Sequence, residues 1–130
     1  MIITTCGNSE KIAQRVAKEL KAQYSPLTIS AFPDGDIYLK YNVDVKNQVV
    51  VIIHSFQPHS NESLFNILFA AETAQDLGAK KVILVAPYLA FMRQDKRFNP
   101  GEAISSRIMA KHLNFCLDKI ITIDPHLHRY

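Results

Sequence analysis

The chain has 130 residues, of which 48% are hydrophobic and 21% are charged, a size and composition typical of one globular domain rather than of disordered or fibrous proteins. The formal net charge of +3 is too small to indicate nucleic-acid binding by itself. No apolar stretch approaches the roughly 18 residues that a membrane helix needs, and the first residues lack the features of a secretory signal.

The first third of the sequence predicts a strand, a helix and two further strands. An apolar strand is expected at residues 2–6, and the turn that follows can cap a helix. The apolar face of this helix consists of Ile12, Ala13, Val16, Ala17 and Leu20. A second strand is expected at residues 27–32 and an alternating, half-exposed strand at residues 37–43, separated by a strong turn signal at residues 33–36.

The rest of the sequence alternates strands with helices. The expected elements are a strand at 48–54, a helix at 61–77, a strand at 81–86, a helix at 103–115 and a strand at 119–123. The inner face of the last helix would carry Ile104, Ile108, Met109 and Leu113. The β-branched run from Val49 to Ile53 is typical of a strand buried on both faces, as in a parallel sheet.

This order of elements predicts a fold class. Strands that alternate with helices indicate an α/β domain with an open, mostly parallel sheet flanked by helices. A short antiparallel excursion is expected near residues 37–54. We expect residues 1–130 to form a single domain.

The two cysteines and three of the five histidines fit structural roles. Cys6 and Cys116 lie far apart and form no C-x-x-C motif, so we expect two buried, reduced thiols in a cytosolic protein. Three histidines are expected to be exposed to solvent or hydrogen-bonded in the core: His54, His59 and His112.

A charged stretch, Arg93-Gln94-Asp95-Lys96-Arg97, follows the expected strand at residues 81–86. Ligands of open α/β sheets bind beyond the carboxyl ends of the strands, where this stretch is expected to lie. Arginine offers a planar fork of donors that fits phosphate oxygens, lysine adds a mobile charge, and the next helix can add amide donors. The stretch is therefore a candidate polyanion site, and the alternative is a solvated surface loop.

Three further polar residues, Asp124, His126 and His128, follow the last expected strand. If that strand continues, alternate residues share one face. Carboxylate and imidazole groups can hold a metal ion, with imidazole favouring transition metals and oxygen ligands suiting Mg²⁺. The alternative is a polar strand end.

Two acids, Asp34 and Asp36, flank Gly35 in the turn at residues 33–36. Their carboxylates can accept hydrogen bonds from an amine, or the segment can simply form a turn. The sequence contains neither the P-loop pattern G-x-x-x-x-G-K-[ST] nor the dinucleotide pattern G-x-G-x-x-G.

Taken together, these segments resemble the N-terminal half of ribose-phosphate pyrophosphokinase, also called phosphoribosyl pyrophosphate synthetase. The likeness covers nearly all of the chain in the expected order, in Gly7-Asn8, residues 32–38, Asn61-Glu62-Ser63-Leu64, residues 87–97, residues 100–105 and residues 121–126. The resemblance implies an enzyme that transfers the β,γ-diphosphoryl group of ATP to the anomeric hydroxyl of ribose 5-phosphate, releases AMP and requires Mg²⁺. It also implies a cytoplasmic homo-oligomer, a dimer or hexamer at full length, without nucleic-acid or membrane partners.

The resemblance also assigns the residues that bind ATP: Phe32, Asp34, Gly35 and Asp36 in one loop, and Arg93, Gln94 and Asp95 in another. Phe32 would stack on or line the adenine site, and the two acids would accept hydrogen bonds from the adenine amine, usually in a neighbouring subunit. The second loop would hold the phosphates and the ribose region. His126 would ligate, directly or through water, the Mg²⁺ bound to ATP. No catalytic residue is expected in this half.

Two substitutions depart from the family pattern. Asp36 stands where a glutamate is often found, which keeps the carboxylate but shortens its reach. Phe91 stands where a tyrosine is common, which removes a hydroxyl.

The family's chain is about twice as long, and the ribose-phosphate loop and the mobile catalytic loop of its second half do not occur here. We therefore expect an excised or truncated N-terminal half that alone does not make phosphoribosyl pyrophosphate. Detection of this product from the purified chain would contradict that expectation. The alternatives are a non-catalytic regulatory relative that binds active synthetase subunits, and a generic nucleotide-binding α/β module.

Overall fold

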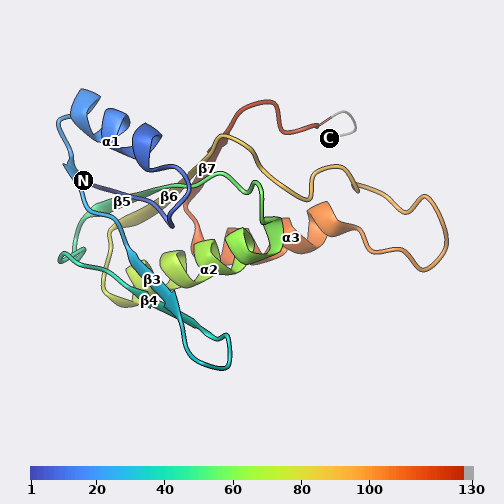
Figure 1. The fold of residues 1–130 in the computed structure, drawn as a ribbon. Helices are drawn as coiled ribbons and strands as arrows, with labels where there is room; N and C mark the ends of the chain where they lie inside the picture. The colour runs from blue at the N-terminus through green and yellow to red at the C-terminus, as the bar shows by residue number, and fades with distance from the viewer. Residues whose placement is uncertain (128–130) are drawn as a thin grey trace.

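A five-stranded sheet with helices on both faces forms the centre of the fold (Figure 1). The computed structural model describes residues 1–127. Its elements are, in chain order, β1 (Ile2–Thr4), α1 (Glu10–Glu19), β2 (Gln23–Tyr24), β3 (Thr28–Ala31), β4 (Ile37–Lys40), β5 (Val49–Ile53), α2 (Ser60–Asp76), β6 (Lys81–Ala86), α3 (Ser105–Cys116) and β7 (Lys119–Thr122).

The main sheet has the strand order β2-β1-β5-β6-β7, and all four neighbouring pairs are parallel. In the register of the sheet, Ile2 lies opposite Val50, and Val50 lies opposite Val82. Val50, Ile52 and Ile53 of the central strand β5 have no exposed surface. The predicted α/β class and the prediction of a strand buried on both faces are therefore confirmed.

The antiparallel part of the fold is the hairpin of β3 and β4, which pair from Thr28 opposite Lys40 to Ala31 opposite Ile37. The expected excursion is present, but it spans residues 28–40, and β5 belongs to the parallel sheet. The reason is that the tight turn at residues 33–36 joins two consecutive strands, which such a turn can connect only in antiparallel fashion.

Strand β2 and several element ends differ from the prediction. β2 has two residues and pairs only with β1 at the sheet edge, so it carries too little alternation to be detected in the sequence. The first strand ends at Thr4 and the last at Thr122, each one or two residues earlier than expected, while α3 begins at Ser105, two residues later.

Helix α1 covers one face of the sheet, against Ile3, Val51 and Ile53. Ala13 and Ala17 form its buried centre, whereas Ile12 is 46% and Leu20 57% exposed. Of the residues on the predicted apolar face, Ile12 and Leu20 therefore lie at its margins, because the two alanines let the helix lie close to the sheet.

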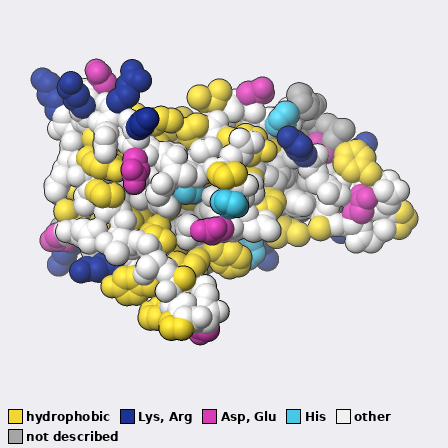
Figure 2. All heavy atoms as spheres, viewed as in Figure 1, with side chains coloured by type: hydrophobic (Ala, Val, Ile, Leu, Met, Phe, Trp, Pro, Cys, Tyr) yellow, Lys and Arg dark blue, Asp and Glu magenta, His cyan; other side chains and the backbone are white. Residues whose placement is uncertain are grey.

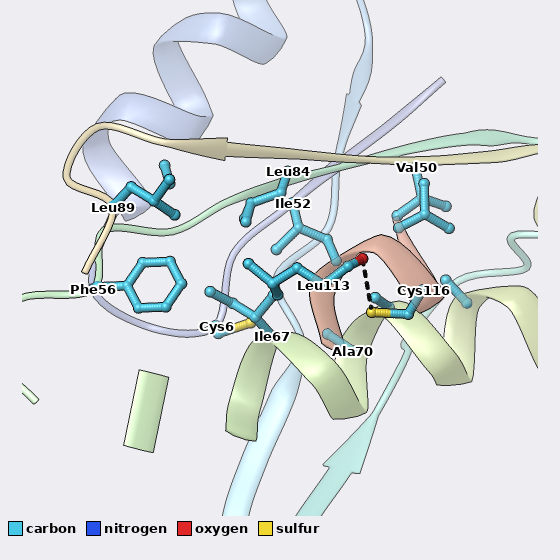
Figure 3. Close-up of a cluster of buried hydrophobic side chains, with 14 of the residues drawn as sticks. Cys6, Val50, Ile52, Phe56, Ile67, Ala70, Leu84, Leu89, Leu113 and Cys116 are labelled. Carbon is cyan, nitrogen blue, oxygen red and sulfur yellow. Dashed lines mark hydrogen bonds between the residues drawn. The ribbon is translucent and has the colours of Figure 1, made fainter. Parts of the chain in front are cut away.

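Helices α2 and α3 pack together on the opposite face and enclose the larger core. Figure 3 shows Ile67 of α2 and Leu113 of α3 pointing toward Ile52 and Leu84 of the sheet. Met109 is buried as predicted, but Ile108 is 53% exposed, so its assignment to the core was wrong. It lies one residue round the helix from Met109, on the side that faces away from α2 and the sheet.

Both cysteines are free and buried, as predicted. Burial raises the pKa of Cys6 to about 12 and that of Cys116 to about 11. Thiols with such pKa values hold their protons at neutral pH and act as apolar packing groups.

Within residues 1–127, the helices are too short or too polar for any of them to cross a membrane.

Candidate functional site

Two polar segments leave the sheet at the same edge. Strands β6 and β7 are parallel neighbours, with Ala86 opposite Thr122 at their carboxyl ends. The loop that contains residues 93–97 follows β6, and the segment with His126 follows β7. A cavity of about 350 Å³ is lined jointly by Met92, Arg107 and Leu127, so the neighbours of Arg93 and His126 in the sequence come together in space.

The loop of residues 93–97 is organised by one acid, Glu102. Its Oε2 accepts hydrogen bonds from Gln94 Nε2 (3.1 Å), from the Phe98 amide (2.9 Å) and from the Asn99 amide (3.0 Å). Its Oε1 accepts another from Asn99 Nδ2 at 2.7 Å. These bonds, led by that from the Asn99 side chain, lower the pKa of Glu102 and keep it ionised.

The same loop is tied to the start of α3 and presents its cations outward. The Ser106 amide donates to the Gln94 carbonyl at 3.2 Å. Arg93, Lys96 and Arg97 are exposed, whereas Gln94 and Asp95 are half-buried, and Lys96 Nζ lies 5.3 Å from the centre of the Phe98 ring. The loop therefore offers guanidinium and ammonium groups on a fixed backbone, which is what a phosphate chain requires.

Sequence reasoning missed Glu102, although an acid inside a basic stretch was a visible signal. Its function as a hydrogen-bond centre depends on the folded loop, which brings Gln94 back to a residue eight positions later.

Replacement of Glu102 by alanine is expected to loosen this loop. Trypsin cleavage after Arg93, Lys96 or Arg97 should accelerate on the order of tenfold, because cleavage follows the population of locally opened chain. Glu19→Ala, at an exposed position in the last turn of α1, is the matched control and should leave the rate unchanged. Equal cleavage rates in the two variants would contradict the assigned role of Glu102.

The acidic loop forms the tip of the β3–β4 hairpin. The Phe32 amide donates to the Asp36 carbonyl and the Gly35 amide to the Phe32 carbonyl, both at 2.8 Å. Asp34 Oδ1 accepts from the Asp36 amide at 3.2 Å, and Gly35 has φ +94°, which favours glycine. Asp34 therefore helps to build the turn, while both acids remain exposed to solvent.

An apolar hollow lies beside this tip. It has a volume of about 470 Å³ and is lined by Phe32, Gly35, Asp36, Ile37, Phe65 and Phe69. Phe32 is 52% exposed and contacts Tyr38 edge-to-face, with ring centres 5.8 Å apart. Figure 2 shows hydrophobic side chains gathered over the hairpin and the adjoining part of this face. Sequence reasoning missed Phe65 and Phe69, whose spacing of four residues on the outer face of a helix was the available signal.

The two candidate ATP-binding loops lie apart within one chain. In Figure 1 the hairpin tip projects below α2, whereas the loop before α3 extends from the other end of the molecule. A single chain therefore does not bring Phe32 to Arg93.

The segment after β7 does not have the geometry expected for a strand-borne metal site. β7 ends at Thr122, and Asp124 and His126 have φ values of +45° and +54°, so they do not share one strand face. His128 lies outside the described residues. Residues 1–127 contain no group of three His, Cys, Asp or Glu side chains placed to hold a metal ion.

The other three histidines differ from one another. His59 and His112 are exposed to solvent, which is one of the two alternatives expected from the sequence. His54 is 2% exposed, and within the described part of the chain neither ring nitrogen has a hydrogen-bond partner. The expectation of an exposed or hydrogen-bonded histidine was therefore wrong for His54, which directly follows β5 and lines a cavity together with residues from the start of α2.

Known proteins share this architecture. A crystal structure of phosphoribosylpyrophosphate synthetase from Mycobacterium smegmatis matches with a TM-score of 0.88 and 25% identity, over 98% of this chain and 44% of that one. The ribose-phosphate pyrophosphokinase of Methanopyrus kandleri is 36% identical over 126 residues, which are 97% of this chain and 43% of that protein. That of Methanobrevibacter smithii is 38% identical over 119 residues, or 91% of this chain and 40% of the relative.

This chain thus spans less than half the length of these relatives. A family model described as the N-terminal domain of ribose phosphate pyrophosphokinase matches residues 1–116. Because that match covers most of the sequence, the chain belongs to the family of the N-terminal domain of ribose phosphate pyrophosphokinase.

Proposed function

We propose that this chain is the ATP-binding half of a ribose-phosphate diphosphokinase. The whole enzyme would transfer the diphosphoryl group of ATP to the anomeric hydroxyl of ribose 5-phosphate, giving phosphoribosyl pyrophosphate and AMP. The observation that carries this proposal is that the loop with Arg93, after β6, and the segment with His126, after β7, lie at the same edge of the sheet. Membership of the ribose phosphate pyrophosphokinase family supports the same reading.

The phosphates of ATP are assigned to the loop of residues 93–97. Arg93 is exposed at its start and can place a planar pair of donors on two phosphate oxygens. Gln94, fixed through Glu102 and the Ser106 amide, and Asp95 would complete contacts to the phosphates and the ribose. The hydrogen bonds of Glu102 supply preorganisation, so that little ordering is required when the nucleotide binds.

Mg²⁺ is assigned to the nucleotide rather than to a cage of protein ligands. It is commonly held by one or two protein groups together with substrate phosphates and water, and the lack of a three-ligand cluster within residues 1–127 fits that arrangement. His126 would hold it, directly or through a water molecule. When bound, the ion supplies neutralisation of charge on the phosphate oxygens.

The adenine ring is assigned to the hairpin of a second copy of the chain. Phe32 offers an exposed aromatic face, and Asp34 and Asp36 offer acceptors for the adenine amine. Because this tip lies apart from Arg93 within one chain, a complete ATP site would combine two subunits. A homo-oligomer, a dimer or hexamer at full length, follows from that assignment.

Ribose 5-phosphate and the catalytic loop are assigned to a second domain. Transfer of a diphosphoryl group depends chiefly on positioning of both substrates and on charge neutralisation. Residues 93–97 would position and neutralise ATP, but they would not hold ribose 5-phosphate. We therefore propose that the 130-residue chain does not catalyse the reaction. The buried, reduced cysteines support a cytoplasmic location.

Calorimetric titration of Mg-ATP into the chain tests the assignment. Arg93→Ala is expected to weaken binding roughly 10- to 100-fold, since hydrogen bonds to charged groups contribute about 1.5–3 kcal/mol each. His126→Ala should weaken binding of Mg-ATP while leaving that of metal-free ATP unchanged.

Arg15→Ala is the matched control, because Arg15 is an exposed arginine on α1, a helix whose contacts are with β1, β2 and β5. Its affinity for Mg-ATP should equal that of the unmodified chain. An Arg93→Ala variant that binds as well as the control would contradict the proposed phosphate site.

A further inference from the structure

A separate crevice lies where the connections of the main sheet diverge. From β1 the chain runs through α1 to β2 on one side, and from β5 it runs through α2 to β6 on the other. Strands β1 and β5 are adjacent and parallel, so their carboxyl ends border a topological switch point. In open α/β sheets ligands bind in the crevice at such a point.

A cavity of about 220 Å³ occupies this position, which we call the switch-point crevice. Its lining comes from the segment after β1, the segment after β5 and the start of α2: Cys6, Gly7, Asn8, His54, Pro58, His59, Glu62, Ser63 and Asn66. Asn8 Nδ2 donates to the Gln57 carbonyl at 2.9 Å and also to the Ser55 carbonyl. These bonds tie the two loops together, so the crevice is formed without a ligand.

The lining includes a buried polar group that lacks a partner. His54 is 2% exposed, and its Nδ1 and Nε2 make no hydrogen bond to any of residues 1–127. Burial lowers its pKa to about 4, so near neutral pH the ring offers one N–H donor and one acceptor. A buried donor or acceptor without a partner costs about 1–3 kcal/mol, which a ligand with the complementary groups would recover.

The charges around the crevice select against anions. Among its described lining residues Glu62 is acidic, and there is no lysine or arginine. Figure 2 shows acidic and histidine side chains next to each other on this face. A phosphate or carboxylate would meet a carboxylate without a compensating cation, whereas a group that donates hydrogen bonds would be favoured.

The polar groups at the base of the crevice suit one kind of ligand. Asn66 is 6% exposed and Ser63 4% exposed, both on the face of α2 that lies toward His54. An asparagine amide recognises an amino group and the neighbouring ring nitrogen of a base as a pair. The volume is below the usual range for ligand pockets of about 300–1,000 Å³, which limits the ligand to one or two rings.

We propose that the switch-point crevice binds a small uncharged aminoheterocycle, of the class of adenine and cytosine, through Asn66 and His54. The ring lies between the loop after β1 and the start of α2. A Cβ atom built at Gly7, one of the lining residues, would meet no atom within 4 Å, so this residue borders open space. This site is distinct from the proposed ATP site and does not depend on it.

Titration of the ¹⁵N-labelled chain with adenine, cytosine, uracil and inorganic phosphate, followed by amide chemical shifts, tests the proposal. Adenine and cytosine should shift the amides of Gly7, Asn8 and Ser63, and uracil and phosphate should not. Asn66→Leu should weaken adenine binding at least tenfold. Glu62→Gln, at an exposed position where folding is not at risk, should weaken it several-fold.

Phe32→Ala is the control that separates this site from the hairpin, and it should leave the shifts at Gly7, Asn8 and Ser63 unchanged. The proposal is overturned if adenine gives no shifts around the crevice. It is also overturned if those shifts persist in both Asn66→Leu and Glu62→Gln, if they vanish in Phe32→Ala, or if phosphate binds in place of adenine. Failure of the Arg93→Ala titration would leave these outcomes unaffected.

Discussion

Replacement of Phe56 by alanine is expected to lower the free energy of unfolding by about 3–5 kcal/mol, the range for removal of a buried phenyl ring. Phe56 has no exposed surface and is among the largest fully buried side chains. Its ring meets that of Phe91 edge-to-face with centres 6.5 Å apart, and Figure 3 shows it beside Leu89. The loss therefore combines a cavity with the loss of an aromatic pair.

The effect should also reach the proposed ATP site. The ring of Phe56 contacts that of Phe91, which precedes Arg93 in the loop after β6, so its removal also removes a support of that loop. Urea denaturation measures the loss of stability. Phe115→Ala is the matched control, since Phe115 is 76% exposed, and its effect should stay within about 0.5 kcal/mol. Similar losses in the two variants would show that Phe56 is not a core residue.

Acidification is expected to destabilise the fold through His54 by about 2–3 kcal/mol between pH 7 and pH 4.5. Burial lowers the pKa of His54 to about 4, from 6.5 for the unfolded chain. Below pH 6.5 the unfolded chain takes up a proton that the folded chain takes up only near pH 4. Stability therefore rises with pH across this window and falls as the pH drops through it.

Urea denaturation at several pH values isolates this contribution when variants are compared. His54→Gln should remove most of the dependence between pH 4.5 and pH 6.5, leaving the part that belongs to the carboxylates. His112→Gln, at an exposed position on α3, should retain the full dependence of the unmodified chain. If the His54 and His112 variants gave parallel curves, the buried, uncharged state of His54 would be refuted.

Patterns that repeat over several residues were enough to predict the layers of the fold. The run from Val49 to Ile53 and the alternation of strands with helices predicted the parallel sheet, which is confirmed. Strand β2 was not predicted, because two residues are too few to show the alternation of apolar and polar side chains that indicates a strand. On α1 the apolar period was correct, but which side chains lie at its centre depends on how closely Ala13 and Ala17 approach the sheet.

The site was harder to predict than the fold because its geometry depends on contacts between distant residues. The basic stretch and the acidic turn could be located from the sequence, and the structure describes the bonds that shape each of them. The role of Glu102 depends on the path of a loop, and the isolation of His54 depends on residues from other segments that surround it. The residues next to Glu102 or His54 in the sequence do not reveal these contacts.

The order of strands also affects how the chain is made. β1 is synthesised before β5, yet in the finished sheet it lies between β2 and β5. Translation proceeds at about 5–20 residues per second. The backbone groups of β1 that later pair with β5 therefore have no partner strand for several seconds, until Val49–Ile53 leaves the ribosome. During that time the apolar residues of β1 have no permanent neighbour on that side. A chaperone that binds short extended segments would find this strand accessible early in synthesis and closed to it afterwards.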